Sequence, residues 1–232
     1  MTDPVRRADA RIRRAFDVAS AAIGLVVAAP VLLVAAVGVR LSSPGPVLFR
    51  TRRLGRGGCP FLMYKLRTMH VDHGPVRSRI TLARDPRIFP FGVLLRRLKI
   101  DELPQLVNVL KGDMAIVGPR PEDPELVARH YTPEQRETLA VRPGLTSPGS
   151  LYYELHAQSQ LDGPDAESRY AAYALPLKLA IDLVYVRRAT LWSDLGVIAR
   201  TLVVLAGALT GRRRFADPPE LREAHRLLGD LA

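Results

Sequence analysis

The segment KIDELPQLVNVLKGDMAIVGPRPE, residues 99–122, contains the most clearly patterned helix in this 232-residue chain. Its apolar side chains recur every three or four positions, the spacing of one helix face: Leu103, Leu106, Val107 and Leu110. Lys111 and Gly112 then supply a basic last turn and a C-terminal glycine, both typical of a helix end. The pattern predicts a helix that begins near residue 103 and ends at Gly112.

Two neighbouring carboxylates, Asp101 and Glu102, stand at the head of this helix. One interpretation is structural: Asp101 caps the helix by accepting a free backbone N–H, with Glu102 in the first turn. The other is chemical, because the flanking segments carry more cations than one carboxylate pair needs. These cations are Lys65, Arg67, Arg96, Arg97, Lys99 and Arg120. Nearby cations favour an ionised Asp101, which suits a nucleophile or a ligand of Mg²⁺ in phosphoryl transfer, with Glu102 binding the metal or moving a proton.

Arg120 lies between Pro119 and Pro121, with Pro124 close behind. A helix cannot continue through these prolines, so the arginine is predicted to stand on a stiff, extended turn. A guanidinium held in this way suits bidentate binding of a phosphate group.

The N-terminal region contains the run AAIGLVVAAPVLLVAAVGV, residues 21–39, without a single charge. A straight helix of this length just crosses a bilayer core, but Pro30 lies at its middle and predicts a kink or break. Arginines flank the run on both sides: Arg6, Arg7, Arg11, Arg13 and Arg14 before it, and Arg40, Arg50, Arg52, Arg53 and Arg56 after it. This symmetry favours a re-entrant helical hairpin with both ends on the cytoplasmic side. A straight single span and a cleaved signal peptide are the alternatives.

The chain carries 34 Lys and Arg residues against 23 Asp and Glu residues, a formal net charge of +11. Such a charge indicates a polyanionic partner: nucleic acid, an anionic membrane surface or a phosphorylated ligand. Cys59 is the only cysteine, which excludes an internal disulfide and favours a reducing compartment. It is interpreted as an inert turn residue, and the five histidines show no metal-ligand spacing.

The rest of the chain predicts a small β-hairpin and several short helices. Two strands, residues 46–55 and 60–69, are joined by a turn at Gly55, Gly57 and Gly58. Further expectations are a loop at 70–92, an amphipathic stretch at 93–100, a helix start at 133–139, a loop at 142–149 and two helices within 174–214. The second of these two helices, residues 193–209, follows Trp192 and is predicted either to lie at a membrane interface or to be a buried core helix.

These elements predict an α+β, mostly helical fold. We expect a basic N-terminal segment with the re-entrant membrane helix at 1–43, a cytosolic catalytic domain at 44–211 with the β-hairpin and amphipathic interfacial helices, and a basic C-terminal tail at 212–232. The arginine clusters near both ends are expected to meet anionic lipid head groups.

Four segments in one collinear order carry a family resemblance. They are KLRTM (65–69), LKIDELPQLVNVLKGDMAIVGPRPE (98–122), RPGLT (142–146) and DLVYVRRATLWSDL (182–195). Together they closely resemble the small bacterial monotopic phosphoglycosyl transferases, the polyprenyl-phosphate sugar-1-phosphate transferases of the bacterial sugar transferase family. The resemblance runs from about residue 16 to 209.

The resemblance implies an enzyme at the cytoplasmic face of the inner membrane that transfers a sugar 1-phosphate from a UDP-sugar to undecaprenyl phosphate. The aspartate of its Asp-Glu pair, here Asp101 with Glu102, would capture the phosphosugar covalently and release UMP, with Mg²⁺ as cofactor. The phosphate-binding set is expected to be Lys65, Arg67, Arg96, Arg120 and Arg142. Asp182 and Tyr185 match a later motif, and a homodimer is one possible assembly.

Two positions depart from the family pattern. The break at Pro30 follows Ala29 instead of the usual serine, and residues 147–156, SPGSLYYELH, replace the usual Gly-Trp-Ala-Gln-Val-Asn-Gly run. If that loop reads the nucleotide or the sugar, the donor differs from that of common members. Two other function classes stay open from the residues alone: a nucleic-acid-binding protein, for which no recognition motif is present, and a non-catalytic membrane scaffold.

Overall fold

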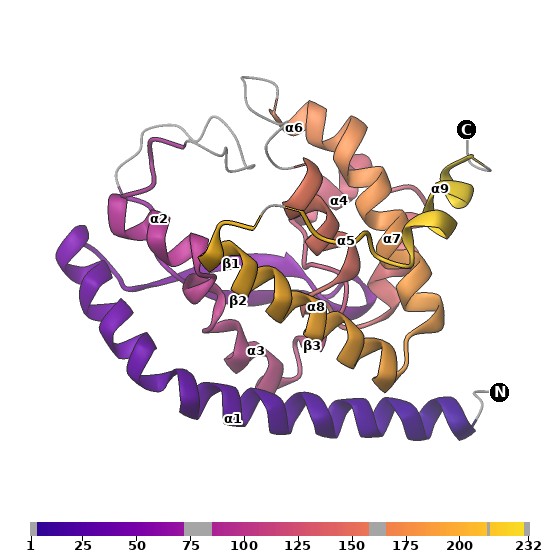
Figure 1. Cartoon of the computed structure of the whole chain (residues 1–232), viewed down its shortest axis with the longest axis horizontal. Helices are drawn as coiled ribbons and strands as arrows, with labels where there is room; N and C mark the ends of the chain where they lie inside the picture. Colours follow the sequence, from indigo (N-terminus) through magenta and orange to yellow (C-terminus); the bar gives the residue numbers. More distant parts are fainter. Residues whose placement is uncertain (1–3, 72–84, 158–165, 213, 230–232) are drawn as a thin grey trace.

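The computed structural model describes residues 4–71, 85–157, 166–212 and 214–229. Within these residues the chain is mostly helical, with two small two-stranded sheets, so the α+β, mostly helical prediction is confirmed. A long N-terminal helix runs along one edge of the molecule, and the other elements lie to one side of it (Figure 1).

Helix α1, Pro4–Ser42, is continuous through Pro30, so two helices separated by a break are not seen. Instead the helix bends towards its C-terminal end (Figure 1). Its buried positions follow one stripe: Asp17, Ala21, Ala28, Ala35 and Val39. Small residues on this stripe let neighbouring elements approach, and a Cβ added at Gly24 would lie 3.2 Å from Leu106.

The opposite face of α1 leaves large apolar side chains uncovered: Ile23, Val26, Val27, Leu33, Val34, Val37 and Leu41. Its span Asp9–Ser42 is long and apolar enough to cross a membrane, and little of its most apolar stretch is buried against the rest of the structure. An exposed apolar surface of this kind on a water-soluble protein would be costly, so α1 is suited to contact lipid.

The predicted β-hairpin is confirmed. Strands β1, Leu48–Leu54, and β2, Pro60–Leu66, pair antiparallel with Leu48 opposite Leu66. The connection contains the 3-10 turn η1, Arg56–Gly58, in which Gly57 has φ 68° and Gly58 has φ 74°. Glycine adopts such values without a steric penalty, and this explains the glycine-rich turn.

Three short elements follow in the described chain: helix α2, Pro90–Arg97, the 3-10 turn η2, Ile100–Glu102, and helix α3, Gln105–Lys111. The expected loop at 70–92 is too long, because α2 begins at Pro90, a residue well suited to a first helical turn. Residues 72–84 of that loop lie outside the described residues. The α3 prediction is confirmed, and Gly112 ends the helix with φ 89°.

A second sheet was missed. Strands β3, Ala115–Val117, and β4, Gly144–Thr146, pair in parallel, so residues 142–149 are not all loop. Each strand has three residues, too few to show an alternating pattern. The backbones at Gly118, directly after β3, and at Gly144 lie in close contact: a Cβ on Gly144 would lie 2.1 Å from the Gly118 nitrogen, so only glycine fits there.

Helix α4, Pro124–His130, was also missed, although Asp123 caps it by accepting the Glu125 N–H at 3.0 Å. The helix start expected at 133–139 is the 3-10 helix η3, Gln135–Ala140. The later elements are α5 (Pro148–Tyr152), the π-helix η4 (Tyr153–Ala157), α6 (Ala166–Arg169), the π-helix η6 (Tyr170–Ala174), α7 (Leu175–Arg188), α8 (Leu191–Thr210) and α9 (Leu221–Gly229).

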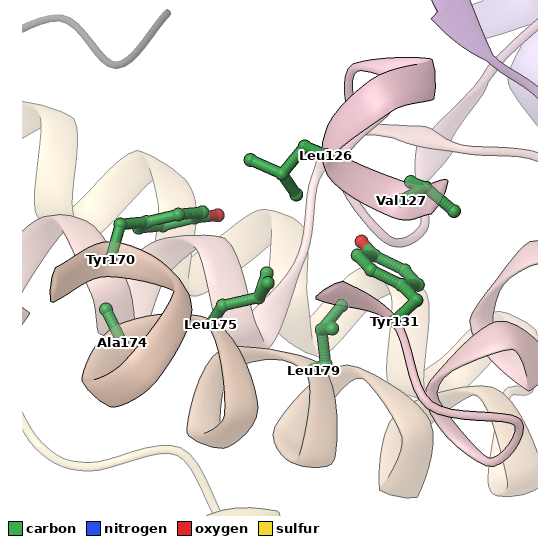
Figure 2. Packing of buried hydrophobic residues seen from close by; sticks show 7 residues of the cluster. All are labelled: Leu126, Val127, Tyr131, Tyr170, Ala174, Leu175 and Leu179. Atoms are coloured by element: carbon green, nitrogen blue, oxygen red, sulfur yellow. The ribbon is translucent and has the colours of Figure 1, made fainter. Parts of the chain in front are cut away.

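One core cluster joins α4 to the η6–α7 segment. Leu126, Val127 and Tyr131 face the side chains of Tyr170, Ala174, Leu175 and Leu179 across the interface (Figure 2). Helix α9 packs on α7 as well, with Ala224 fully buried and Arg188 paired to Glu223 at 2.8 Å. The region expected as a basic tail thus contains a packed helix.

The two helices predicted within 174–214 are α7 and α8. Helix α8 begins at Leu191, two residues before the expected start, because Thr190 caps it by accepting the Ser193 N–H at 3.2 Å. Several of its large side chains are exposed, among them Trp192, Leu202, Val203 and Leu209, while Val197 is buried in a cluster with Val117 and Tyr185. The buried-core alternative does not describe this helix, and its exposed apolar surface favours a membrane interface.

Candidate functional site

The two carboxylates at the head of the opening motif lie in η2, and Asp101 does not cap α3. The backbone N–H groups of Glu102 and Leu103 donate to the carbonyls of Lys99 and Ile100 within this 3-10 turn. Pro104 precedes α3 and has no N–H to offer. The capping prediction is therefore wrong, and the Asp101 side chain is not used to stabilise the start of α3.

The Asp101 carboxylate is buried, with the residue 5% exposed, and its Oδ1 atom has no hydrogen-bond partner among the described residues. A buried oxygen without a partner costs folding free energy, so it is uncommon outside functional sites. Lys99, two residues earlier, has the left-handed φ of 57°, which is strained for a residue with a side chain. This tight turn brings both carboxylates into the site.

Glu102 is held by two cations. Its Oε1 accepts from Lys65 Nζ at 2.9 Å and from Arg120 Nη2 at 2.6 Å, and its Oε2 accepts from Arg120 Nη1 at 3.3 Å. Lys65 comes from β2 and Arg120 from the proline-flanked turn after β3, so three segments meet at this carboxylate. The structure brings together Lys65, Asp101, Glu102 and Arg120, as expected.

The two carboxylates differ in their electrostatic environment. Arg120 and Lys65 hold the pKa of Glu102 well below its usual value, against the cost of burial. Burial raises the pKa of Asp101, the Glu102 charge raises it further, and Lys65, Arg96 and Lys99 oppose the change. Burial also lowers the pKa of Lys65, although Glu102 opposes it. The cations of the site therefore stabilise the charge of Glu102 more than that of Asp101. They favour an anionic Asp101, as expected, but burial and the Glu102 charge outweigh them and leave its pKa raised.

Arg96 lies in the last turn of α2, and among the described residues no hydrogen bond or ion pair engages its side chain. Its positive charge acts on Asp101 and lowers the pKa of that carboxyl. It is therefore a cation near the nucleophile candidate with its donors available to a ligand.

Arg67 lies elsewhere. Its buried guanidinium donates to Pro46 O at 2.6 Å, to Ser43 Oγ at 2.8 Å and to Ser43 O at 2.7 Å. It also lies over the Phe89 ring, 5.9 Å from the centroid. Arg67 thus fastens the loop after α1 to the hairpin, and the structure does not place it with Glu102.

Arg142 also lies apart from Glu102. Its Nε donates to Gly112 O at 3.0 Å, at the end of α3, and the residue lines a different cavity together with Arg14 and Arg56. The expected phosphate-binding set is therefore divided: Lys65, Arg96 and Arg120 act on the two carboxylates, while Arg67 and Arg142 have other neighbours.

Asp182, from the later motif, has a structural role near the site. Asp182 is fully buried in α7 and accepts the Gly149 N–H at 2.9 Å and the Ser147 hydroxyl at 3.2 Å. These are the first residues of the divergent segment 147–156, so Asp182 holds that segment in place. Burial raises the pKa of Asp182 to about 6.

Tyr185 has a different role. Its hydroxyl donates to Asp194 of α8 and accepts from Arg13 of α1 at 3.0 Å, while Arg13 Nε pairs with Asp194 at 2.6 Å. This cluster ties α1 to α7 and α8, which makes Tyr185 a link between the apolar helix and the rest of the chain.

Sequence reasoning missed two contacts. Glu122, at the end of the GPRPE motif, pairs with the buried Lys178 and accepts the Tyr170 hydroxyl at 3.0 Å. Glu122 lies two residues after Arg120, so its pairing with Lys178 helps to fix the turn that carries Arg120. The presence of a glutamate in the GPRPE motif could have indicated this contact. Glu154, from the divergent segment, pairs with Lys99 at 2.9 Å, so that segment reaches the turn carrying both carboxylates.

The donor set is compatible with Mg²⁺ in part. No group of three His, Cys, Asp or Glu side chains suited to a metal occurs in the described part of the chain. Mg²⁺ commonly keeps several waters and takes only one or two carboxylates together with substrate phosphates. The unpartnered Asp101 Oδ1 fits such a ligand, with Glu102 adjacent, and the phosphates would come from the substrate.

Residues 8–208 match the family model described as bacterial sugar transferase. Relatives include a UDP-glucose:undecaprenyl-phosphate glucose-1-phosphate transferase from Caulobacter vibrioides, 40% identical over 82% of this chain and 68% of its own length. An exopolysaccharide production protein from Rhizobium leguminosarum is 38% identical over 84% of this chain and 95% of its own length. A further UDP-glucose:undecaprenyl-phosphate glucose-1-phosphate transferase, from Escherichia coli, is 33% identical over 86% of this chain and 41% of its own length.

Proposed function

The chain belongs to the bacterial sugar transferase family, and we propose that it transfers a sugar 1-phosphate from a UDP-sugar to undecaprenyl phosphate. The resemblance stated from the sequence motifs is confirmed by the family match, and the chain is an enzyme of the sugar phosphotransferase class. A non-catalytic scaffold and a nucleic-acid-binding protein are set aside on this ground.

One observation carries the proposed chemistry: Asp101 has a buried oxygen that accepts no hydrogen bond from any described residue, whereas Glu102 beside it is neutralised by Lys65 and Arg120. A carboxylate with no hydrogen bond to its oxygen and a raised pKa is more basic, and hence a better nucleophile, than one that is tied into ion pairs. Asp101 is therefore assigned as the nucleophile and Glu102 as the residue that positions the cations.

In the first step an Asp101 carboxylate oxygen attacks the phosphorus that bears the sugar. An oxygen–phosphorus bond forms to Asp101, and the bond from that phosphorus to the bridging oxygen breaks. The bridging oxygen leaves with UMP and carries the electron pair, so the sugar phosphate remains on Asp101 as an acyl phosphate. In the second step a phosphate oxygen of undecaprenyl phosphate attacks the same phosphorus, and Asp101 is released as a carboxylate.

The cations around the pair suit both steps. No described residue engages the Arg96 donors, and Lys65 and Arg120 are close enough to Asp101 to neutralise the phosphate oxygens of a donor bound next to it. Mg²⁺, held by Asp101 and Glu102, would supply further neutralisation of the diphosphate oxygens when bound. The divergent segment reaches the same turn through Glu154, so it is a candidate for donor selection.

For the membrane arrangement we propose a re-entrant α1 at the cytoplasmic face of the inner membrane. The support is the bend of the Pro30-containing helix (Figure 1), the exposed apolar face of α1 and the arginines at both of its ends. The exposed apolar side chains of α8 would rest in the interface, and the flanking arginines would meet anionic lipid head groups.

The experiment that tests the chemistry uses Asp101→Asn in the full chain, with UDP-sugars, Mg²⁺ and undecaprenyl phosphate, and follows UMP. UMP release is expected to fall to background while membrane association is retained. Asp217→Asn, which neutralises an exposed carboxylate elsewhere, is the matched control. Intact-mass detection of a phosphosugar adduct on the parent, absent from Asp101→Asn, tests the covalent step, and parental turnover by Asp101→Asn contradicts the assignment.

A further inference from the structure

A second cationic cavity lies apart from the Asp101 site. It measures about 160 Å³, and neither carboxylate of the pair lines it, nor do Lys65 and Arg120. Its polar lining residues are Arg13 and Arg14 and Asp17 from α1, Arg56 from the hairpin turn, Arg142 before β4, and Tyr185 from α7. Four guanidinium groups therefore border one small cavity.

Three of these arginines are fixed by the carbonyl ends of helices. Arg14 donates to Val109 O at 2.8 Å and to Leu110 O at 3.1 Å, both in the last turn of α3. Arg142 donates through Nε to Gly112 O at 3.0 Å, directly after α3. Cations are favoured at helix C-termini, so these contacts hold the guanidiniums in fixed positions.

Arg56 is held in the same way, with Nε donating to Ala140 O at 3.2 Å at the end of η3. In Arg56 and Arg142 only Nε is engaged within the described residues, so both terminal amino groups of each guanidinium remain available. Binding to a helix end accounts for the Nε group of each guanidinium, but it assigns no role to the two terminal amino groups.

The charges around the cavity do not balance. Arg13 is neutralised by Asp194, with contacts of 2.6 and 3.1 Å. Asp17 is the carboxylate among the lining residues, and its Oδ1 accepts the Ile116 N–H at 2.9 Å. Arg14, Arg56 and Arg142 thus face a single carboxylate, and burial together with the charges of Arg14 and Arg56 lowers the pKa of Arg142. Converging like charges whose donors are not engaged by the described residues are typical of an anion-binding site.

We propose that this cavity is a binding site for a phosphate group, formed by Arg14, Arg56 and Arg142 and separate from the Asp101 site. Arginine binds phosphate with two parallel hydrogen bonds, and the free edges of Arg56 and Arg142 supply such donors. The phosphate comes either from the head group of an anionic lipid, since the cavity is bordered by the start of the apolar helix α1, or from a soluble phosphorylated compound.

Equilibrium dialysis of the full chain in detergent with radiolabelled inorganic phosphate tests this site. Arg120→Gln weakens any phosphate binding at the Asp101 site, so the binding that survives in this background reports the cavity. Adding Arg142→Gln is expected to weaken the remaining binding roughly tenfold or more, the usual consequence of losing one charged hydrogen bond. Arg129→Gln, which removes an exposed arginine of α4, is the matched control and is expected to leave binding unchanged.

Arg56→Gln guards against a folding defect, because Arg56 is exposed and contributes one hydrogen bond to the fold. It is expected to weaken phosphate binding in the same direction with an unchanged unfolding temperature. The proposal is overturned if Arg120→Gln alone abolishes all phosphate binding, or if neither cavity variant differs from Arg129→Gln.

Nanodiscs distinguish the two sources of the phosphate. If phosphatidylglycerol, added to phosphatidylcholine discs, displaces the inorganic phosphate that is sensitive to Arg142→Gln, the occupant is a lipid head group. If the same phosphate stays bound in both kinds of disc, the occupant is a soluble phosphorylated compound. Both results support a phosphate site in this cavity.

Discussion

Arg120 and Glu102 form a two-pronged ion pair, with Nη2 2.6 Å from Oε1 and Nη1 3.3 Å from Oε2. Lys65 Nζ lies 2.9 Å from the same Oε1 atom, so both cations pair with Glu102 and not with Asp101. Glu102 is thus held by two ion pairs, whereas Asp101 Oδ1 has no hydrogen-bond partner among the described residues. This division is consistent with one positioning residue and one nucleophile.

The first prediction concerns Glu102→Gln. Removing its charge takes away a repulsion that raises the pKa of Asp101 and frees Lys65 and Arg120 to pair with Asp101 instead. Both effects lower the pKa of Asp101 and reduce its nucleophilicity. We expect kcat/KM to fall roughly 100-fold, as when one electrostatic element of an active site is removed, and its acidic limb to move to lower pH.

The control for this prediction is Glu134→Gln, which removes an exposed glutamate of the loop before η3. Its kcat/KM and pH profile are expected to match those of the parent. An acidic limb that stays in place in Glu102→Gln would show that the two carboxylates do not interact.

The second prediction separates Arg67 from substrate binding. Arg67→Ala leaves the carbonyls of Ser43 and Pro46 without their donor, and unsatisfied groups of this kind cost about 1–3 kcal/mol each. We expect the free energy of unfolding in detergent to fall by about 2–6 kcal/mol, with kcat/KM of the folded protein close to that of the parent. A large loss of kcat/KM at unchanged stability would instead return Arg67 to the phosphate-binding set.

Local patterns in the sequence predicted the elements that a few neighbouring residues determine. Helix α3 follows from four apolar side chains at helical spacing and from Gly112, and the hairpin follows from two apolar runs around a glycine turn. The parallel pairing of β3 with β4 joins residues that lie far apart in the chain, with Ala115 opposite Gly144, and no local pattern encodes such a contact.

The family motifs were sufficient to predict which residues belong to the site. They were not sufficient to predict contacts that depend on the conformation of neighbouring segments. Lys65, Glu102 and Arg120 meet as the resemblance implied. Asp101 does not cap α3, because the 3-10 turn before Pro104 satisfies its own backbone groups. The motif could not show that the loop after α1 presents Ser43 and Pro46 to Arg67, a contact between side chain and backbone that depends on where α1 ends.

The third prediction concerns Asp182 and pH. Burial raises its pKa in the folded protein to about 6, above the ordinary value of 3.8. Between these values the folded protein binds the proton more tightly than the unfolded chain, so this group's contribution to stability is complete below about pH 4 and is lost as the pH rises through about 6. The loss corresponds to about 2–3 kcal/mol for a shift of this size.

Asp182→Asn removes this titration, and its amide oxygen can still accept the Gly149 N–H. Relative to the parent, the variant is therefore expected to gain stability as the pH rises from about 4 to about 7, whatever the constant offset between them. Denaturant unfolding in detergent at several pH values measures the difference, and parallel curves for the two proteins over this range would contradict the raised pKa.

The fourth prediction concerns the ends of α1. In a re-entrant arrangement both ends lie on the cytoplasmic side, together with the exposed Cys59 of the hairpin turn. Arg11→Cys and Arg40→Cys, each in a Cys59→Ser background, place single thiols at exposed positions near the two ends of the apolar run. A membrane-impermeant maleimide is expected to label neither thiol in intact spheroplasts and both in inverted vesicles, as it does Cys59 in the parent chain.

Pro30→Leu is the matched variant for the bend, because it restores the backbone N–H that proline lacks and removes the ring that clashes with the preceding turn. A straighter apolar helix gains by spanning the bilayer, so part of the population is expected to expose the thiol at position 11 to the outside. If that thiol is labelled from outside in the chain that retains Pro30, α1 spans the membrane and the proline bend does not set its topology.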